Sequence, residues 1–143
     1  MSLDTMQVME VMHRSLDATD LRQTVIANNI ANIDVPNYKR KGVRFESTLS
    51  RALHPEPSPR FISKKTRVTH IGFGEPENIH PNDVNPGIEV EIETEYRNDG
   101  SNVDIDHEMG EIRKNAELYE VVAARVASMY SMINNVIQRG GTV

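Results

Sequence analysis

Acidic and histidine side chains are the groups in this chain that could bind a metal or transfer a proton, but their spacing builds no such site. No pair of histidines has the HExxH spacing that would place two imidazoles on one helix face. The histidines are His13, His54, His70, His80 and His107. The acidic stretch 95–106 fails as a calcium loop, because Arg97 falls on the third ligand position and Asp106 where a bidentate Glu is needed. The spacing predicts no catalytic or metal site.

Other reactive motifs are missing as well. The chain has no Cys, so thiolate chemistry, disulfides and Cys-based zinc sites are excluded. The glycine pair 72–74 is too short to cradle a phosphate, and Glu89, Glu91 and Glu93 alternate as solvated strand residues do. The net charge of −5 argues against nucleic-acid binding. We therefore expect no enzyme, no cofactor, no small-molecule substrate and no nucleic-acid partner.

Amide side chains gather where a helical pattern is about to end. Asn28, Asn29 and Asn32 each lower helix propensity, so a partner outside the helix must compensate. At about 100° per residue, Asn28 and Asn32 share the apolar face of Leu21 and Val25, and Asn29 lies elsewhere. Two interpretations are open. The asparagines prepare a turn, or buried amides set the register of a helix–helix contact.

A well-specified turn follows these asparagines. Pro36 fixes its own φ and pushes Val35 out of the α region, so the helix should end near residues 33–34. Pro36 and Asn37 suit the centre of a type II turn, whose second position needs a positive φ. Tyr38 and Phe45 then flank a basic cluster, which comprises Lys39, Arg40, Lys41 and Arg44.

This stretch resembles the N-terminal signature of the bacterial flagellar basal-body rod family, Asn-x-x-Asn-x-x-Thr-Pro-Gly-Tyr with an aromatic residue downstream. Asn29, Asn32, Pro36 and Tyr38 match, whereas Val35 and Asn37 replace the usual Thr and Gly. The short length, the run 21–32 and the segment 102–109 (NVDIDHEM) are similar to proximal rod subunits in particular. The resemblance covers about the first 46 and the last 42 residues.

The resemblance implies a structural subunit of the rod, the drive shaft that links the membrane ring to the distal rod and hook and is needed for motility. Its partners would be other rod subunits and further copies of itself in a helical assembly, with membrane-ring and export-gate components of the basal body. It also implies a periplasmic location after type III flagellar export. The N-terminus has no basic region followed by an apolar run, so no cleavable signal peptide is expected.

Long helices are predicted at both ends, since all seven prolines lie between residues 36 and 86. The C-terminal helix has an unbroken heptad seam and Asp104 as its N-cap, with Gly140 and Gly141 ending it. The seam consists of Ile105, Met109, Ile112, Ala116, Tyr119, Ala123, Val126, Tyr130, Ile133 and Ile137. A less regular stripe marks the N-terminal helix. We expect an antiparallel coiled-coil pair whose remaining apolar faces pack on other subunits.

The middle of the chain is Pro-rich, with strand candidates at 67–71 and 88–96. In the second candidate, apolar residues alternate with glutamates. Its apolar face should therefore pack on the helix pair or on a neighbour, and the glutamates should remain exposed to solvent. Residues 36–67 hold nine Lys/Arg and residues 75–108 hold eleven Asp/Glu. These bands are either two solvated surfaces or complementary bands that meet within one subunit or between neighbours.

The predicted organisation is mainly α, with an irregular middle that contains short strands. Residues 1–35 form the N-terminal helix, 36–102 the rod-motif loop and middle region, and 103–143 the C-terminal heptad helix. The predicted subunit-contact motif comprises Asn28, Asn29, Asn32, Pro36, Asn37, Tyr38 and Phe45, and we expect it to act between subunits more than in folding. The alternative function is a soluble coiled-coil binding module, such as a flagellar export chaperone or adaptor.

Overall fold

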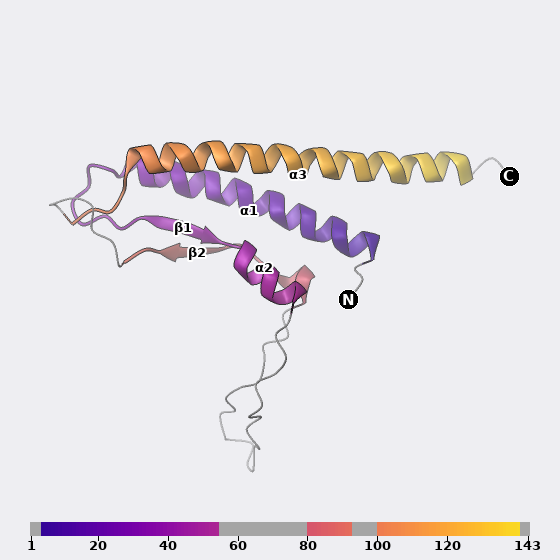
Figure 1. Ribbon diagram of the computed structural model, residues 1–143, viewed down its shortest axis with the longest axis horizontal. Coiled ribbons are helices and arrows are strands. Elements are labelled where there is room, and N and C mark those ends of the chain that lie inside the picture. Colours follow the sequence, from indigo (N-terminus) through magenta and orange to yellow (C-terminus); the bar gives the residue numbers. More distant parts are fainter. Residues whose placement is uncertain (1–3, 55–79, 93–99, 141–143) are drawn as a thin grey trace, which may run out of the picture.

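Two long helices dominate the computed structural model, which describes residues 4–54, 80–92 and 100–140. The elements are α1 (Thr5–Ala31), β1 (Lys41–Arg44), α2 (Glu46–Leu53), the 3-10 turn η1 (Pro81–Asp83), β2 (Gly87–Val90) and α3 (Ile105–Gly140). α1 packs along α3, and the β1–β2 hairpin lies on the side of α1 away from α3 (Figure 1). The mainly α prediction with paired terminal helices is therefore confirmed, whereas the strand candidate at 67–71 lies outside the described residues.

α1 begins and ends at residues that satisfy its free backbone groups. Asp4 caps the first turn, and the side chain of Gln7 accepts from the Asp4 N–H at 3.1 Å in a capping box. At the other end, the Asn32 N–H bonds back to the Asn29 carbonyl. The helix therefore ends at Ala31, slightly earlier than Pro36 alone predicts.

α1 and α3 run antiparallel. As the residue number rises in α3, that of the α1 partner falls, through the pairs Glu108–Asn29, Asn115–Thr19 and Tyr130–His13. Asp104 starts α3 as predicted, because its carboxylate accepts from the Asp106 N–H at 2.9 Å.

The residues of α3 that pack on α1 lie on a different side of the helix from most of the predicted seam. The buried residues of α3 are Glu108, Asn115, Val126 and Met129. Of the ten seam residues, Val126 alone is buried; Ile112, Ala123 and Ile133 are half-buried, and the other six are exposed. Most of the predicted seam therefore does not face α1, because apolar spacing gave no weight to polar core positions such as Glu108 and Asn115. Its packing between subunits stays a prediction.

A small apolar core under α1 holds the middle region. Ala18 of α1, Phe45, Ala52 of α2 and Val84 are buried together, with Leu49 packed against them. Phe45 is 3% exposed, so its predicted place in a subunit contact is wrong for this fold. Neither α2 nor β1 was predicted, since each is too short for periodicity to detect.

β1 and β2 form a two-stranded antiparallel sheet in which Lys41 pairs with Val90 and Val43 with Ile88. The basic and acidic bands of the sequence meet here within one chain. Arg40 pairs with Glu91, and Arg44 lies 3.8 Å from Glu89. β2 ends at Val90, earlier than predicted, and residues 93–96 lie outside the described part.

Candidate assembly site at the end of the helix pair

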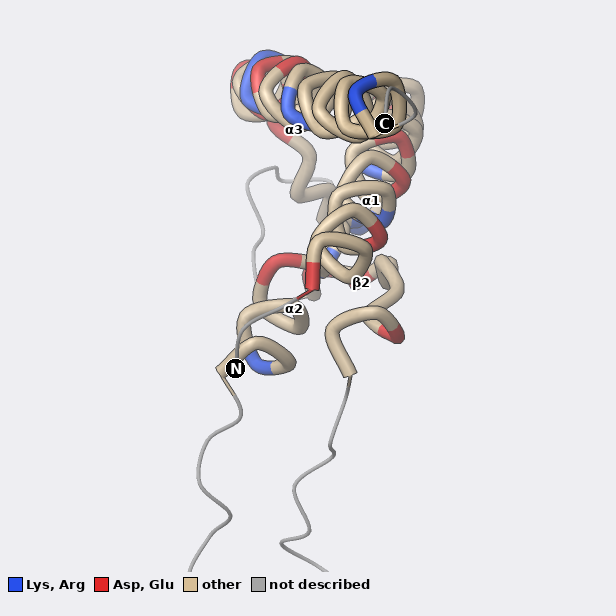
Figure 2. The backbone as a smooth tube through the Cα atoms, turned by 90° about the vertical axis from the view of Figure 1, so that its right-hand side faces the viewer, with Lys and Arg blue, Asp and Glu red and all other residues tan. Residues whose placement is uncertain are grey.

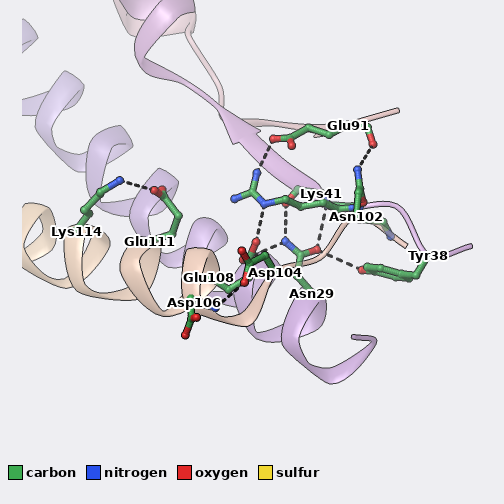
Figure 3. A network of polar contacts seen from close by, with 11 residues as sticks. Asn29, Tyr38, Lys41, Glu91, Asn102, Asp104, Asp106, Glu108, Glu111 and Lys114 are labelled. Carbon is green, nitrogen blue, oxygen red and sulfur yellow. Dashed lines mark hydrogen bonds and ion pairs between the residues drawn. The ribbon is translucent and has the colours of Figure 1, made fainter. Parts of the chain in front are cut away.

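The site is built where α1 ends, β1 begins and α3 begins. Figure 3 shows Asn29 of α1 between the backbone of Lys41 and the carboxylate of Glu108. The Asn29 amide nitrogen donates to the Lys41 carbonyl at 2.8 Å, and its oxygen accepts from the Lys41 N–H at 3.0 Å. One side chain thus bonds to β1 as a neighbouring strand would. Asn29 has no exposed surface, so these bonds compensate for its poor helix propensity.

A second amide holds the opposite side of β1. The Asn102 oxygen accepts from the Arg40 N–H at 2.6 Å, and its nitrogen donates to the Glu91 carbonyl at 2.8 Å. Asn102 is therefore inserted into the ladder where β1 and β2 separate (Figure 3). Two buried asparagines fix the start of β1, one on each side.

Arg40 connects the strands to α3. Its guanidinium bonds to Glu108 and to Glu91, and Glu108 is completely buried. Burial alone would lower the pKa of Arg40, but the hydrogen bonds and charges of Glu108 and Glu91 outweigh it and raise that pKa. The guanidinium therefore stays charged and ties the first turn of α3 to the hairpin.

The exposed part of the motif is the loop between α1 and β1. Val35 is 45% exposed, and Pro36 and Asn37 are exposed beside it. Asn37 has φ of 59°, the positive value that the turn prediction required. The loop lies against Gly100, where an added Cβ would come within 2.7 Å of the Asn37 Oδ1.

The predicted motif residues divide into two groups. Asn29 and Phe45 are buried within the chain, and Tyr38 contacts Asn29 at 3.4 Å. Asn32 donates to the Asn28 carbonyl at 2.7 Å and closes the helix end, while the Asn28 side chain is exposed. The helical wheel had placed Asn28 on the apolar face and Asn29 elsewhere, and this was wrong. The side chains left for a neighbour are those of Asn28, Val35, Pro36 and Asn37.

Sequence reasoning missed three residues of this site: Arg40, Asn102 and Glu108. Asn102 and Glu108 lie in the segment 102–109, which resembles proximal rod subunits but for which the sequence predicted no role. An Asn just before a helix and a Glu in its first turn are ordinary capping residues. Only the pairing of distant segments shows that they bond to Arg40, just before β1.

α3 keeps apolar side chains exposed or, at Ala123, half-buried on two flanks beside its contact with α1. One flank carries Met109, Ala116, Ala123 and Tyr130, and the other carries Leu118, Val121, Met132 and Val136. Tyr130 is 47% exposed and Val121 is 68% exposed. At 100° per residue the two sets lie on opposite sides of the α1-facing direction. The charged residues of α3 gather toward its N-terminal part, with Arg139 near the C-terminus (Figure 2). Such a helix is typical of one that packs against more than one partner.

Other kinds of site receive no support from the described residues. Across residues 4–54, 80–92 and 100–140, no three acidic or histidine side chains come together as a metal site would require. None of the helices described is long and apolar enough to cross a membrane.

Comparison with known proteins identifies the family of this chain. Residues 9–39, which span most of α1 and the motif loop, match the family model described as flagella basal body rod protein. The chain is 37% identical to flagellar basal body rod protein FlgB of Borrelia hermsii, covering 90% of this chain and 94% of that protein. It is 34% identical to FlgB of Bacillus subtilis, over 90% and 92% of the two chains. It is 25% identical to FlgB of Escherichia coli, over 83% and 84%.

The chain therefore belongs to the flagellar basal body rod proteins of the FlgB type, and it is a structural subunit of the rod. The chaperone or adaptor alternative is not favoured.

Proposed function

We propose that this subunit builds the proximal, periplasmic part of the rod by packing the exposed flanks of α3 against helices of neighbouring subunits. The observation that carries the proposal is that α3 is already packed on α1 and still exposes two apolar flanks. Because the flanks differ, a contact between one flank and the other is heterologous, and such a contact propagates into a helical assembly instead of closing.

The loop 33–38 is the second contact in this proposal. It stands at the end of the helix pair, and the backbone just after it is held at Lys41 by Asn29 and at Arg40 by Asn102. A loop held in this way presents Pro36 and Asn37 to a neighbour in a fixed conformation, so the loop loses little conformational entropy when it binds. Further partners in the proposal are membrane-ring and export-gate components of the basal body.

The experiment compares the same substitution at two adjacent alanines of α3. Ala123 is half-buried on one apolar flank, and Ala124 is exposed on the side that faces away from α1. Ala123→Glu should block incorporation into basal bodies and abolish motility, because a close helix–helix contact would be overpacked and would bury a charge. Ala124→Glu should leave both nearly unchanged.

Both purified variants should have the helix content of the wild type, measured by circular dichroism. Normal swimming and normal incorporation of the Ala123→Glu protein would overturn the proposed role of this flank.

A further inference from the structure

The strand β2 turns its apolar side chains away from α1. Glu89 of β2 and Glu91 just after it line a cavity together with α1, while residues on both faces of β2 are exposed. The cavity is lined by Glu89 and Glu91 with Arg22, Val25 and Ile26 of α1, among others. Ile88, Val90 and Ile92 are 57%, 46% and 72% exposed. Among the described residues, these side chains therefore do not pack on the helix pair, and packing on a neighbour, the other predicted alternative, stays a prediction.

β2 also has an open backbone edge. The Glu91 N–H donates to the Arg40 carbonyl at 2.9 Å, which shows that the backbone groups of Glu91 point toward β1. In an antiparallel pair, alternate residues point their N–H and C=O to opposite sides. Those of Ile88 and Val90 therefore point away from β1, and among the described residues no group pairs with them.

The opposite edge of the sheet is already closed. Lys41, the partner of Val90, turns its N–H and C=O away from β2, and both are bonded to the Asn29 amide. At Lys41, therefore, another strand can pair with the sheet only beside β2. A helix docked there would leave the outward groups of β2 unsatisfied, whereas a strand would pair with them.

The charges around the hairpin indicate the chemistry of the missing strand. Arg40 is shared by two carboxylates, Glu91 and Glu108. Arg44 and Glu89 are 3.8 Å apart, and the side chain of each is more than half exposed. The carboxylates on this face are thus incompletely matched, so a strand that carries Lys or Arg toward them would be favoured.

We propose that β2 accepts, as a third strand, an extended segment of a neighbouring rod subunit in which apolar residues alternate with Lys or Arg. The apolar residues of this strand lie beside Ile88, Val90 and Ile92 on one face of the extended sheet, and its basic residues lie beside Glu89 and Glu91 on the other. The inference rests on the proposed function, because the neighbour is another subunit of the same assembly.

Proline at position 90 tests the open edge directly. Val90→Pro removes an N–H that takes no part in the β1–β2 ladder, so the monomer should keep its melting temperature and circular dichroism spectrum. The number of copies in purified basal bodies should fall about tenfold. The control, Val90→Thr, keeps the N–H and the β-branched shape, and should incorporate normally. A stable Val90→Pro protein that incorporates like the wild type would overturn the inference.

Cross-linking from the same position identifies the occupant. Because the chain has no Cys, Val90→Cys can carry a single photoreactive label into basal bodies assembled in cells. Mass spectrometry should find the label on a Lys- or Arg-containing extended segment of another rod subunit. Labels found on a helix of the neighbour, within the same chain, or nowhere in an incorporated subunit would overturn the inference.

The two proposals can fail separately. If wild-type protein is missing from purified basal bodies, the proposed function fails. If labelled protein is incorporated without the expected cross-link, only the third-strand inference fails.

Discussion

The Asn29 side chain forms two hydrogen bonds with the backbone of one residue, Lys41: it donates to the carbonyl at 2.8 Å and accepts from the N–H at 3.0 Å. α1 thereby closes one edge of the hairpin without supplying a strand. The signature asparagine of the motif is thus used in folding of the subunit.

Asn29→Ala should destabilise the monomer. The part-buried hydrogen bonds to the N–H and C=O of Lys41 would be lost, and an unsatisfied buried group costs roughly 1–3 kcal/mol. Chemical denaturation followed by circular dichroism measures the free energy of unfolding. The matched control is Asn28→Ala, one residue earlier and exposed, which should be neutral or stabilising by up to about 0.5 kcal/mol, since Ala is the better helix former.

This result would reverse the expectation drawn from the sequence. Periodicity predicted both long helices and their pairing, because each extends over several turns and carries a continuous apolar stripe. It could not identify which asparagine is buried, since Asn29 bonds to a strand too short to leave a pattern. Phe45 was misassigned for the same reason, because α2, which helps to bury it, is brief. Contacts between distant segments, such as Asn102 with Arg40, leave no local spacing to detect.

Arg40 and Glu108 should show strong energetic coupling. Arg40→Met would leave the buried carboxylate of Glu108 without its cation, at a cost of roughly 3–5 kcal/mol. Arg40→Met combined with Glu108→Gln should be less destabilised than Arg40→Met alone, because the buried charge is gone and an oxygen remains for Asn29. A double-mutant cycle measures this coupling, and additive effects would contradict it.

Asn115 should fix the register of the helix pair. Its amide nitrogen donates to the Thr19 carbonyl at 2.9 Å, while its buried oxygen has no partner among the described residues. Asn115→Leu should therefore raise the melting temperature and loosen the register, as happens when a polar core residue is removed from a coiled coil. Spin labels on cysteines introduced near the ends of α1 and α3 would report a broader distance distribution in the variant. An unchanged distribution would show that the apolar residues fix the register alone.

Glu111 provides a small dependence of stability on pH. The hydrogen bond from Lys114, at 2.7 Å, holds the pKa of this carboxyl below its ordinary value. A carboxyl whose pKa is lower in the folded than in the unfolded protein stabilises the fold at pH values above its unfolded pKa. This stabilisation is lost as the pH falls through the pKa of the folded state. The pair is a surface i,i+3 contact, so the effect should be about 0.2–0.5 kcal/mol. Lys114→Met should remove this part of the acid-side slope in denaturation measured from pH 6 to about pH 3.

Asn37 occupies the position where the family pattern has Gly, and its φ of 59° explains why either residue serves. Asn37→Gly should preserve stability and rod incorporation, because Gly adopts this conformation without strain and also removes the side chain that lies against Gly100. Asn37→Val should cost about 1–2 kcal/mol, because a β-branched residue is strained in the left-handed region. Denaturation compares stability, and basal-body incorporation compares assembly. Since Asn37 is exposed, a stable Asn37→Gly protein that fails to assemble would show that the amide itself contacts a neighbour. Equal assembly of the Asn and Gly proteins would mean that the loop acts through its backbone shape.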